Sequence, residues 1–140
     1  MPDLDLLQGN VAATATRDAP AGFTAADLFD RLVAATPDEL DRLPFGVVAM
    51  GPDFTVEQYN RAESELSGLT PTRVIGRNLF TSVAPCTNNF MVAHRYEAEP
   101  EIDAVIDYVF TFRMAPRKVR LRLLKRAGVA RMYLAVEPRD

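Results

Sequence analysis

Apolar and polar residues alternate through the last third of the chain, which is the pattern of β-strands that bury one face. The alternation predicts three strands, with a break at Ala115-Pro116 and a turn at Gly128. On the first strand the apolar side chains share one face, and they are Ile106, Tyr108, Phe110, Phe112 and Met114. On the second and third strands the inward positions are Val119, Leu121 and Leu123, then Met132, Leu134 and Val136.

Two further strands are predicted near the middle of the chain. Residues 45–50 are β-branched and apolar, Gly51-Pro52-Asp53 has the composition of a turn, and residues 54–60 can pair back as a hairpin. Short helices are expected at 62–66, 71–76 and 90–98, and 78–83 is expected to be a connector. In the last of these helices, Met91 and His94 are expected on the inner side.

Helix signals precede the strands. Thr24 is predicted to begin a helix with Leu28, Leu32 and Val33 on its apolar stripe. Thr36-Pro37-Asp38-Glu39 combines an N-cap residue, a proline at the first helical position and a glutamate at the third. We therefore expect a flexible N-terminal extension over residues 1–22, a helical cap over 23–43 and one domain over 44–140.

The predicted order of elements is a helical cap, two strands, short helices and three strands. This order fits an α+β fold in which a five-stranded antiparallel sheet carries short helices on one face. A length of 140 residues with 48% hydrophobic content fits one folded domain. The net charge of -3 gives no sign of nucleic-acid binding, and no apolar run is long enough to span a membrane. One cysteine and no export signal indicate a cytoplasmic location.

Cys86 is the single cysteine, so it is either a small buried hydrophobe or a working thiol. A catalytic nucleophile lacks support, because the only histidine, His94, lies eight residues further on and no third group orients it. Upstream, Tyr59, Glu63 and Ser67 are four residues apart, so a helical segment would place all three on one face.

Several motifs occur in a characteristic order. They are Tyr59-Asn60-Arg61-Ala62-Glu63, Gly68, Val74-Ile75-Gly76, Asn78, Val83-Ala84-Pro85-Cys86-Thr87 and Met114-Ala115-Pro116-Arg117-Lys118-Val119. Over roughly residues 45–136, these motifs resemble the photoactive yellow proteins, which are PAS-fold blue-light receptors. The resemblance implies a PAS fold and a sensory photoreceptor that is not an enzyme.

Members of that family carry p-coumaric acid (4-hydroxycinnamic acid) as a thioester on a cysteine. The resemblance implies that Cys86 is the attachment site and that Tyr59 and Glu63 hydrogen-bond the phenolate oxygen. It also implies that Ser67 braces the tyrosine hydroxyl. Two residues match the family's pocket lining, and they are Phe110 and Met114.

The implied roles have a physical basis. A phenol has a pKa of about 10 in water, so a buried phenolate needs strong hydrogen-bond donors. A carboxyl group in an apolar pocket keeps its proton because desolvation raises its pKa, so Glu63 would be both donor and proton store. The implied signal is trans–cis isomerisation, proton transfer from Glu63 and loosening of the N-terminal cap by the buried carboxylate. The partner would be a downstream signalling protein, and the receptor a monomer or weak homodimer.

The chain departs from the family pattern at Leu69, where the usual residue is an arginine that shields the phenol end of the pocket. Leu79 and Phe112 replace a usual phenylalanine and a usual tyrosine, and the spacing after Cys86 is shorter. Leu69 is expected to leave the shielding to apolar packing or to another residue. Leu79 and Phe112 are expected to shift colour and kinetics, and the shorter spacing is expected to shift the helix that follows Cys86.

Two alternatives stay open. The domain could be a PAS sensory or interaction module that binds haem through His94, or that binds no ligand. The basic residues between Arg113 and Arg126 could form a partner surface or a nucleic-acid patch. Their alternation with Val119, Leu121 and Leu123 favours a solvated outer strand face instead.

Overall fold

A computed structural model describes residues 22–112 and 115–139 and contains one antiparallel sheet of five strands, in the order β3-β2-β6-β5-β4. The strands are β2 (Gly46–Met50), β3 (Val56–Tyr59), β4 (Ile102–Phe112), β5 (Ala115–Lys125) and β6 (Met132–Pro138). The last strand of the chain therefore lies at the centre of the sheet, between β2 and β5. The predicted sheet and the predicted hairpin of β2 and β3 are confirmed, although β5 already begins at Ala115, where a break was predicted.

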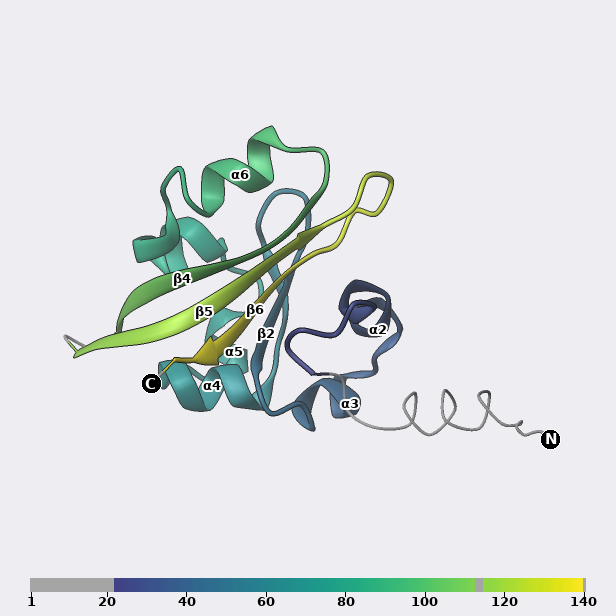
Figure 1. Ribbon diagram of the computed structural model, residues 1–140. Helices are drawn as coiled ribbons and strands as arrows, with labels where there is room; N and C mark the ends of the chain where they lie inside the picture. Colours follow the sequence, from purple (N-terminus) through teal and green to yellow (C-terminus); the bar gives the residue numbers. More distant parts are fainter. Residues whose placement is uncertain (1–21, 113–114, 140) are drawn as a thin grey trace.

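Helices cover both faces of this sheet (Figure 1). They are α2 (Leu28–Ala34), α3 (Pro37–Asp41), α4 (Arg61–Ser67), α5 (Pro71–Val74) and α6 (Ala93–Ala98), with short turns η1 (Leu79–Val83) and η2 (Pro85–Thr87) before α6. The N-terminal helices α2 and α3 pack on one face, and the helices between β3 and β4 pack on the other. None of the helices in the described ranges is long and apolar enough to cross a bilayer.

The alternation of side chains divides the core into two clusters. In β2, Val48 and Met50 join the cluster under α4 to α6, whereas Val47 and Ala49 join the cluster under α2 and α3. All residues of β2 are consequently buried, because successive side chains of a strand point to opposite faces. Tyr133 of β6 makes an edge-to-face contact with Phe29 of α2, at 5.7 Å between ring centroids.

Two of the predicted helix boundaries are confirmed by their capping contacts. The Thr36 hydroxyl accepts a hydrogen bond from the Glu39 amide at 3.2 Å, and the Glu39 carboxylate accepts one from the Thr36 amide at 2.8 Å. These reciprocal bonds satisfy two amides that the first helical turn leaves free. At the end of α4, Gly68 adopts φ 79°, the left-handed conformation that favours glycine.

The prediction for the first helix is wrong in two respects. Helix α2 begins at Leu28 and not at Thr24, because residues 23–27 form turns held by bonds such as Leu28 N to Ala25 O. Val33 was expected on the buried face of the helix but is 49% exposed, and Phe29 is buried in its stead.

The segment from 78 to 98 also differs from the prediction. Residues 79–83 form one π-helical turn, in which the Val83 and Ala84 amides donate to the carbonyls five residues earlier. The Asn78 side chain caps its start by accepting hydrogen bonds from the Phe80 and Thr81 amides. Helix α6 begins at Ala93, three residues later than expected, and its buried residues are Ala93 and Tyr96.

One basic residue of β5 contradicts the interpretation of a solvated outer face. The Arg122 side chain is only 6% exposed and makes a two-bond contact with Asp103 of β4, at 2.9 and 3.0 Å. Its remaining terminal nitrogen donates to the Phe23 and Ala25 carbonyls, at 2.9 and 2.7 Å. Arg122 therefore ties the segment before α2 to the sheet. Arg113 lies outside the described residues, and other basic residues of the stretch, Arg117, Lys118, Arg120 and Arg126, are exposed as predicted.

The proposed division into residues 1–22, 23–43 and 44–140 stays a prediction. Apart from Gly22, the expected extension lies outside the described residues.

Replacement of Arg122 by methionine is expected to lower the free energy of unfolding by about 2–3 kcal/mol, because the Phe23 and Ala25 carbonyls lose a buried charged donor. The matched control is Arg120→Met, whose side chain is 46% exposed and pairs with Glu137, and it should change stability by about 0.5 kcal/mol or less. Urea unfolding midpoints measure both effects. Equal losses in the two variants would show that Arg122 does not anchor the N-terminal segment.

Candidate functional site

Tyr59 and Ser67 are brought into direct contact at the junction of β3 and α4. Tyr59 is the last residue of β3, and the Asn60 side chain caps the helix that follows by accepting a hydrogen bond from the Glu63 amide. Because Tyr59 precedes the helix, only Glu63 and Ser67 share the predicted helical face. The Tyr59 hydroxyl nevertheless donates to Ser67 Oγ at 2.7 Å, and both side chains are buried.

Glu63 is the most unusual residue of the site. Its side chain is buried, with 3% of the residue exposed, and Oε1 has no hydrogen-bond partner among the described residues. The carboxyl group lies against the backbone of β2 at Gly46, where an added Cβ would stand 2.1 Å from Oε1. A glycine at position 46 is therefore required for this placement of the carboxyl group.

Burial controls the protonation of this pair. Desolvation raises the pKa of Glu63 from 4.5 to about 8, and the nearby Tyr59 hydroxyl opposes the shift only in part. Burial and the neighbouring Glu63 carboxyl raise the pKa of Tyr59 as well. At neutral pH both groups are consequently protonated and can donate hydrogen bonds.

Asn60 holds the segments of the site together, and the sequence analysis missed this role. Its side-chain oxygen accepts from the Val47 and Glu63 amides, and its nitrogen donates to the Leu40 and Phe45 carbonyls. This one buried amide connects the end of the N-terminal helices, β2 and the first turn of α4. The signal was available, because asparagine directly before a helix is a preferred N-cap.

Cys86 lies in the three-residue turn η2 and is half-buried. It packs against the same apolar cluster that contains Tyr59 and Phe110. The turn is fixed by Thr87, whose buried hydroxyl donates to the Ala84 carbonyl at 2.6 Å. The thiol thus borders the cluster into which Tyr59 is packed.

The carbonyl of Cys86 has two partners that the sequence analysis also missed. The Tyr108 hydroxyl of β4 donates to it at 2.6 Å, and Asn89 Nδ2 donates to it at 3.2 Å. Neither residue could be assigned to Cys86 from spacing alone, since they approach from a strand and from the following turn.

The other predicted site residues have different outcomes. Phe110 is buried and contacts the Tyr108 ring edge-on, and Leu69 is partly buried against the same cluster. Met114 lies outside the described residues. His94 is exposed and Met91 is 40% exposed, so the expectation that both face inward is wrong. Val92 is fully buried instead. In the described part of the chain, no group of three His, Cys, Asp or Glu side chains could hold a metal ion.

Sequence comparison places this arrangement among known proteins. A family profile described as PAS fold matches residues 40–114. The photoactive yellow protein of Rhodothalassium salexigens is 38% identical over 98 residues, covering 68% of this chain and 78% of that protein. The photoactive yellow protein of Halochromatium salexigens is 33% identical over 106 residues, covering 74% of this chain and 85% of that protein.

Structural comparison agrees. The photoactive yellow protein domain from the sensor histidine kinase Ppr of Rhodospirillum centenum superposes with a TM-score of 0.71 at 40% identity. The match covers 77% of this chain and 97% of that domain. The PAS domain of the HTR-like protein from Haloarcula marismortui has a TM-score of 0.57 at 14% identity, covering 82% of this chain and all of that domain, and supports the fold alone.

Replacement of Glu63 by glutamine is expected to change how stability depends on pH. The folded protein holds a proton on Glu63 up to a pKa of about 8, whereas the unfolded chain releases it near 4.5. The wild-type free energy of unfolding should therefore fall, relative to that of Glu63→Gln, as pH rises from about 4.5 to about 8, and the difference should level off above that range.

The matched control is Glu65→Gln, an exposed glutamate of the same helix. Its stability difference from wild type should stay constant across these pH values when measured by urea unfolding. A constant difference for Glu63→Gln as well would mean that the Glu63 carboxyl is not held protonated by burial.

Proposed function

The chain belongs to the photoactive yellow protein family, whose members are PAS-fold sensory photoreceptors rather than enzymes, and on this basis we propose that it is a blue-light receptor carrying p-coumaric acid as a thioester on Cys86. The observation that carries the proposal is the buried Glu63 carboxyl, whose Oε1 has no partner among the described residues. A buried acceptor or donor without a partner costs free energy, so such a group suggests that a ligand supplies the partner.

The residues present fit this chromophore. Cys86 offers a half-buried thiol for the thioester bond. A protonated Glu63 and the Tyr59 hydroxyl would offer two donors for the phenolate oxygen of a chromophore bound to Cys86. Ser67 Oγ accepts a hydrogen bond from the Tyr59 hydroxyl at 2.7 Å. If the Tyr59 hydrogen turned toward the phenolate oxygen, the Ser67 hydroxyl could donate to the Tyr59 oxygen in return. When bound, the chromophore supplies a double bond that isomerises on absorbing blue light.

The role of Glu63 follows from its burial. Since its pKa is about 8, the carboxyl holds a proton in the dark at neutral pH. Transfer of this proton would leave a carboxylate beside Gly46 with little solvation. An unpaired buried charge costs several kcal/mol, which is a large part of the stability of a small domain. Loss of the Glu63 proton would thus lower the stability of the folded domain.

Leu69 is expected to increase the destabilisation that follows loss of the Glu63 proton. It stands where relatives of this family usually have an arginine, and its partly buried side chain packs on the apolar cluster. An apolar residue at this position provides no positive charge to stabilise a Glu63 carboxylate. We therefore expect the proton transfer to be more destabilising here than it would be beside a cation.

The N-terminal helices are the proposed place where the loss of stability is expressed. Asn60 bonds both the Glu63 amide and the Leu40 carbonyl, so a shift of the first turn of α4 acts directly on the end of α3. Their release would uncover the apolar face formed by Val47, Ala49 and Tyr133. An uncovered apolar face is a suitable signal for a protein partner.

The partner is proposed to be a signalling protein. The structural relative from Rhodospirillum centenum is a domain of a sensor histidine kinase, which is one form that such an output takes in the family. For this chain we propose action in the cytoplasm, where the single cysteine stays reduced, as a monomer or weak homodimer.

The decisive experiment is reconstitution of the apoprotein with an activated p-coumaroyl donor. We expect an intact-mass increase of one p-coumaroyl group and a visible absorption band, both of which should be lost in Cys86→Ser. The control is Ser82→Cys in the Cys86→Ser background, which places the thiol at an exposed position. This protein should be acylated but should show no visible absorption band.

Two results would contradict the proposal. One is an adduct on Cys86 that absorbs only in the ultraviolet, like the adduct at position 82. The other is a Soret band on addition of haem that disappears in His94→Ala, which would favour a haem-binding PAS domain instead.

A further inference from the structure

The backbone of Cys86 is held by a compact hydrogen-bond triangle. The Tyr108 hydroxyl donates to the Cys86 carbonyl at 2.6 Å, Asn89 Nδ2 donates to the same carbonyl at 3.2 Å, and Asn89 Nδ2 also donates to the Tyr108 hydroxyl at 2.6 Å. Tyr108 is 9% exposed, whereas Asn89 and Cys86 are half-buried, so these contacts are partly shielded from water. A carbonyl with two donors resists rotation of its peptide plane, because the rotation breaks both bonds.

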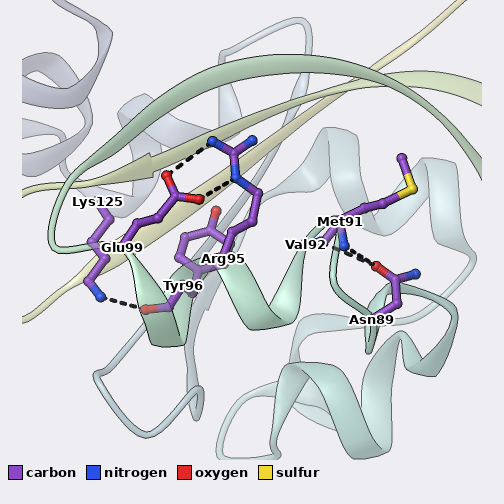
Figure 2. A network of polar contacts seen from close by, with 7 residues as sticks. All are labelled: Asn89, Met91, Val92, Arg95, Tyr96, Glu99 and Lys125. Carbon is purple, nitrogen blue, oxygen red and sulfur yellow. Dashed lines mark hydrogen bonds and ion pairs between the residues drawn. The ribbon is translucent and has the colours of Figure 1, made fainter.

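The other end of the Asn89 side chain holds a second segment. Its Oδ1 accepts hydrogen bonds from the Met91 amide at 2.9 Å and from the Val92 amide at 3.2 Å, as Figure 2 shows. The Asn89 carbonyl in turn accepts from the His94 amide in the first turn of α6. A single side chain therefore joins the peptide of Cys86 to the turn that leads into α6.

This turn exposes apolar surface. Phe90 is 76% exposed and Met91 is 40% exposed, while the next residue, Val92, is fully buried. The turn is thus fixed at one side by Val92 in the core and at the other by the Asn89 side chain. If the Asn89 contacts are lost, Phe90 and Met91 are free to change position.

We propose that Tyr108 and Asn89 are positioning residues that fix the peptide of Cys86 and transmit strain at Cys86 to the turn carrying Phe90 and Met91. The link itself is a property of the apoprotein. Only the source of the strain, isomerisation of a group attached to Cys86, rests on the proposed function. The inference gives the receptor a second responsive surface, on the side of the sheet opposite the N-terminal helices.

The first test uses Tyr108→Phe in the apoprotein. This variant removes one hydroxyl and keeps the ring that contacts Phe110. Asn89 then loses one of its two acceptors, so amide hydrogen exchange at Met91 and Val92 should accelerate by about fivefold, the effect of one hydrogen bond. The matched control is Tyr133→Phe, which removes a hydroxyl on the opposite face and should leave both amides unchanged. Unchanged exchange in Tyr108→Phe would overturn the link.

The second test removes the donor nitrogen of the Asn89 side chain and keeps its acceptor oxygen. Asn89→Asp keeps an oxygen for the Met91 and Val92 amides but has no hydrogen for the Cys86 carbonyl. Because the side chain loses its bonds to both Cys86 and Tyr108, we expect exchange at the two amides to accelerate at least as much as in Tyr108→Phe, and alkylation of Cys86 by iodoacetamide to accelerate about fivefold. The control Asn88→Asp adds the same charge at the neighbouring exposed position. It should change neither the exchange of the two amides nor the alkylation rate of Cys86. Equal alkylation rates in both variants would show that Asn89 does not position Cys86.

The third test uses the reconstituted protein. Blue light should accelerate exchange at Met91 and Val92 in the wild type, and add little in Tyr108→Phe, where the link is already broken. An equal light response in the two proteins would overturn the transmission of strain. Failure of the wild type to take up a p-coumaroyl group would instead refute the proposed function, and the apoprotein measurements would still decide whether Tyr108 and Asn89 hold Cys86.

Discussion

The burial of the Glu63 carboxyl is the constraint on which the rest of the site depends. The group lies against β2 only because position 46 is glycine, and its helix starts where it does because Asn60 caps it. Tyr59 and Ser67 fill the polar positions beside it with one direct hydrogen bond. Desolvation then raises the pKa of Glu63 to about 8, so the site stores a proton at neutral pH. The same burial that favours the protonated form of Glu63 raises the free energy of its ionised form.

The two-sided sheet explains how such a cost can act at a distance. The strands bury side chains on both faces, so the apolar cluster that contains Tyr59 and the cluster under α2 and α3 share β2, β5 and β6. Buried polar side chains connect the layers, and two of them reach the N-terminal segment: Asn60 joins α3 to α4, and Arg122 joins residues 23–25 to the sheet. Both are buried amide or guanidinium groups that satisfy backbone atoms of separate segments. Such contacts couple the N-terminal helices to the sheet more specifically than apolar packing does.

Much of this arrangement could be predicted from the sequence. Alternation gave the strands of the last third, capping rules gave the starts of α3 and α5, and the motif around Tyr59 and Glu63 gave one end of the site. Contacts between residues far apart in the chain could not be predicted in this way. Arg122 has the alternation of a solvated strand residue, and only the N-terminal segment lying over it makes it buried. His94 and Met91 were misplaced because Asn89 delays the start of α6, which turns both residues outward.

The central claim is that Glu63 holds a proton in the dark and gives it up after illumination. Infrared difference spectroscopy of the reconstituted protein under blue light tests it most directly. The account predicts loss of a protonated-carboxyl band in the wild type and absence of that band in Glu63→Gln. A spectrum without such a loss, or a band that survives in Glu63→Gln, would contradict it.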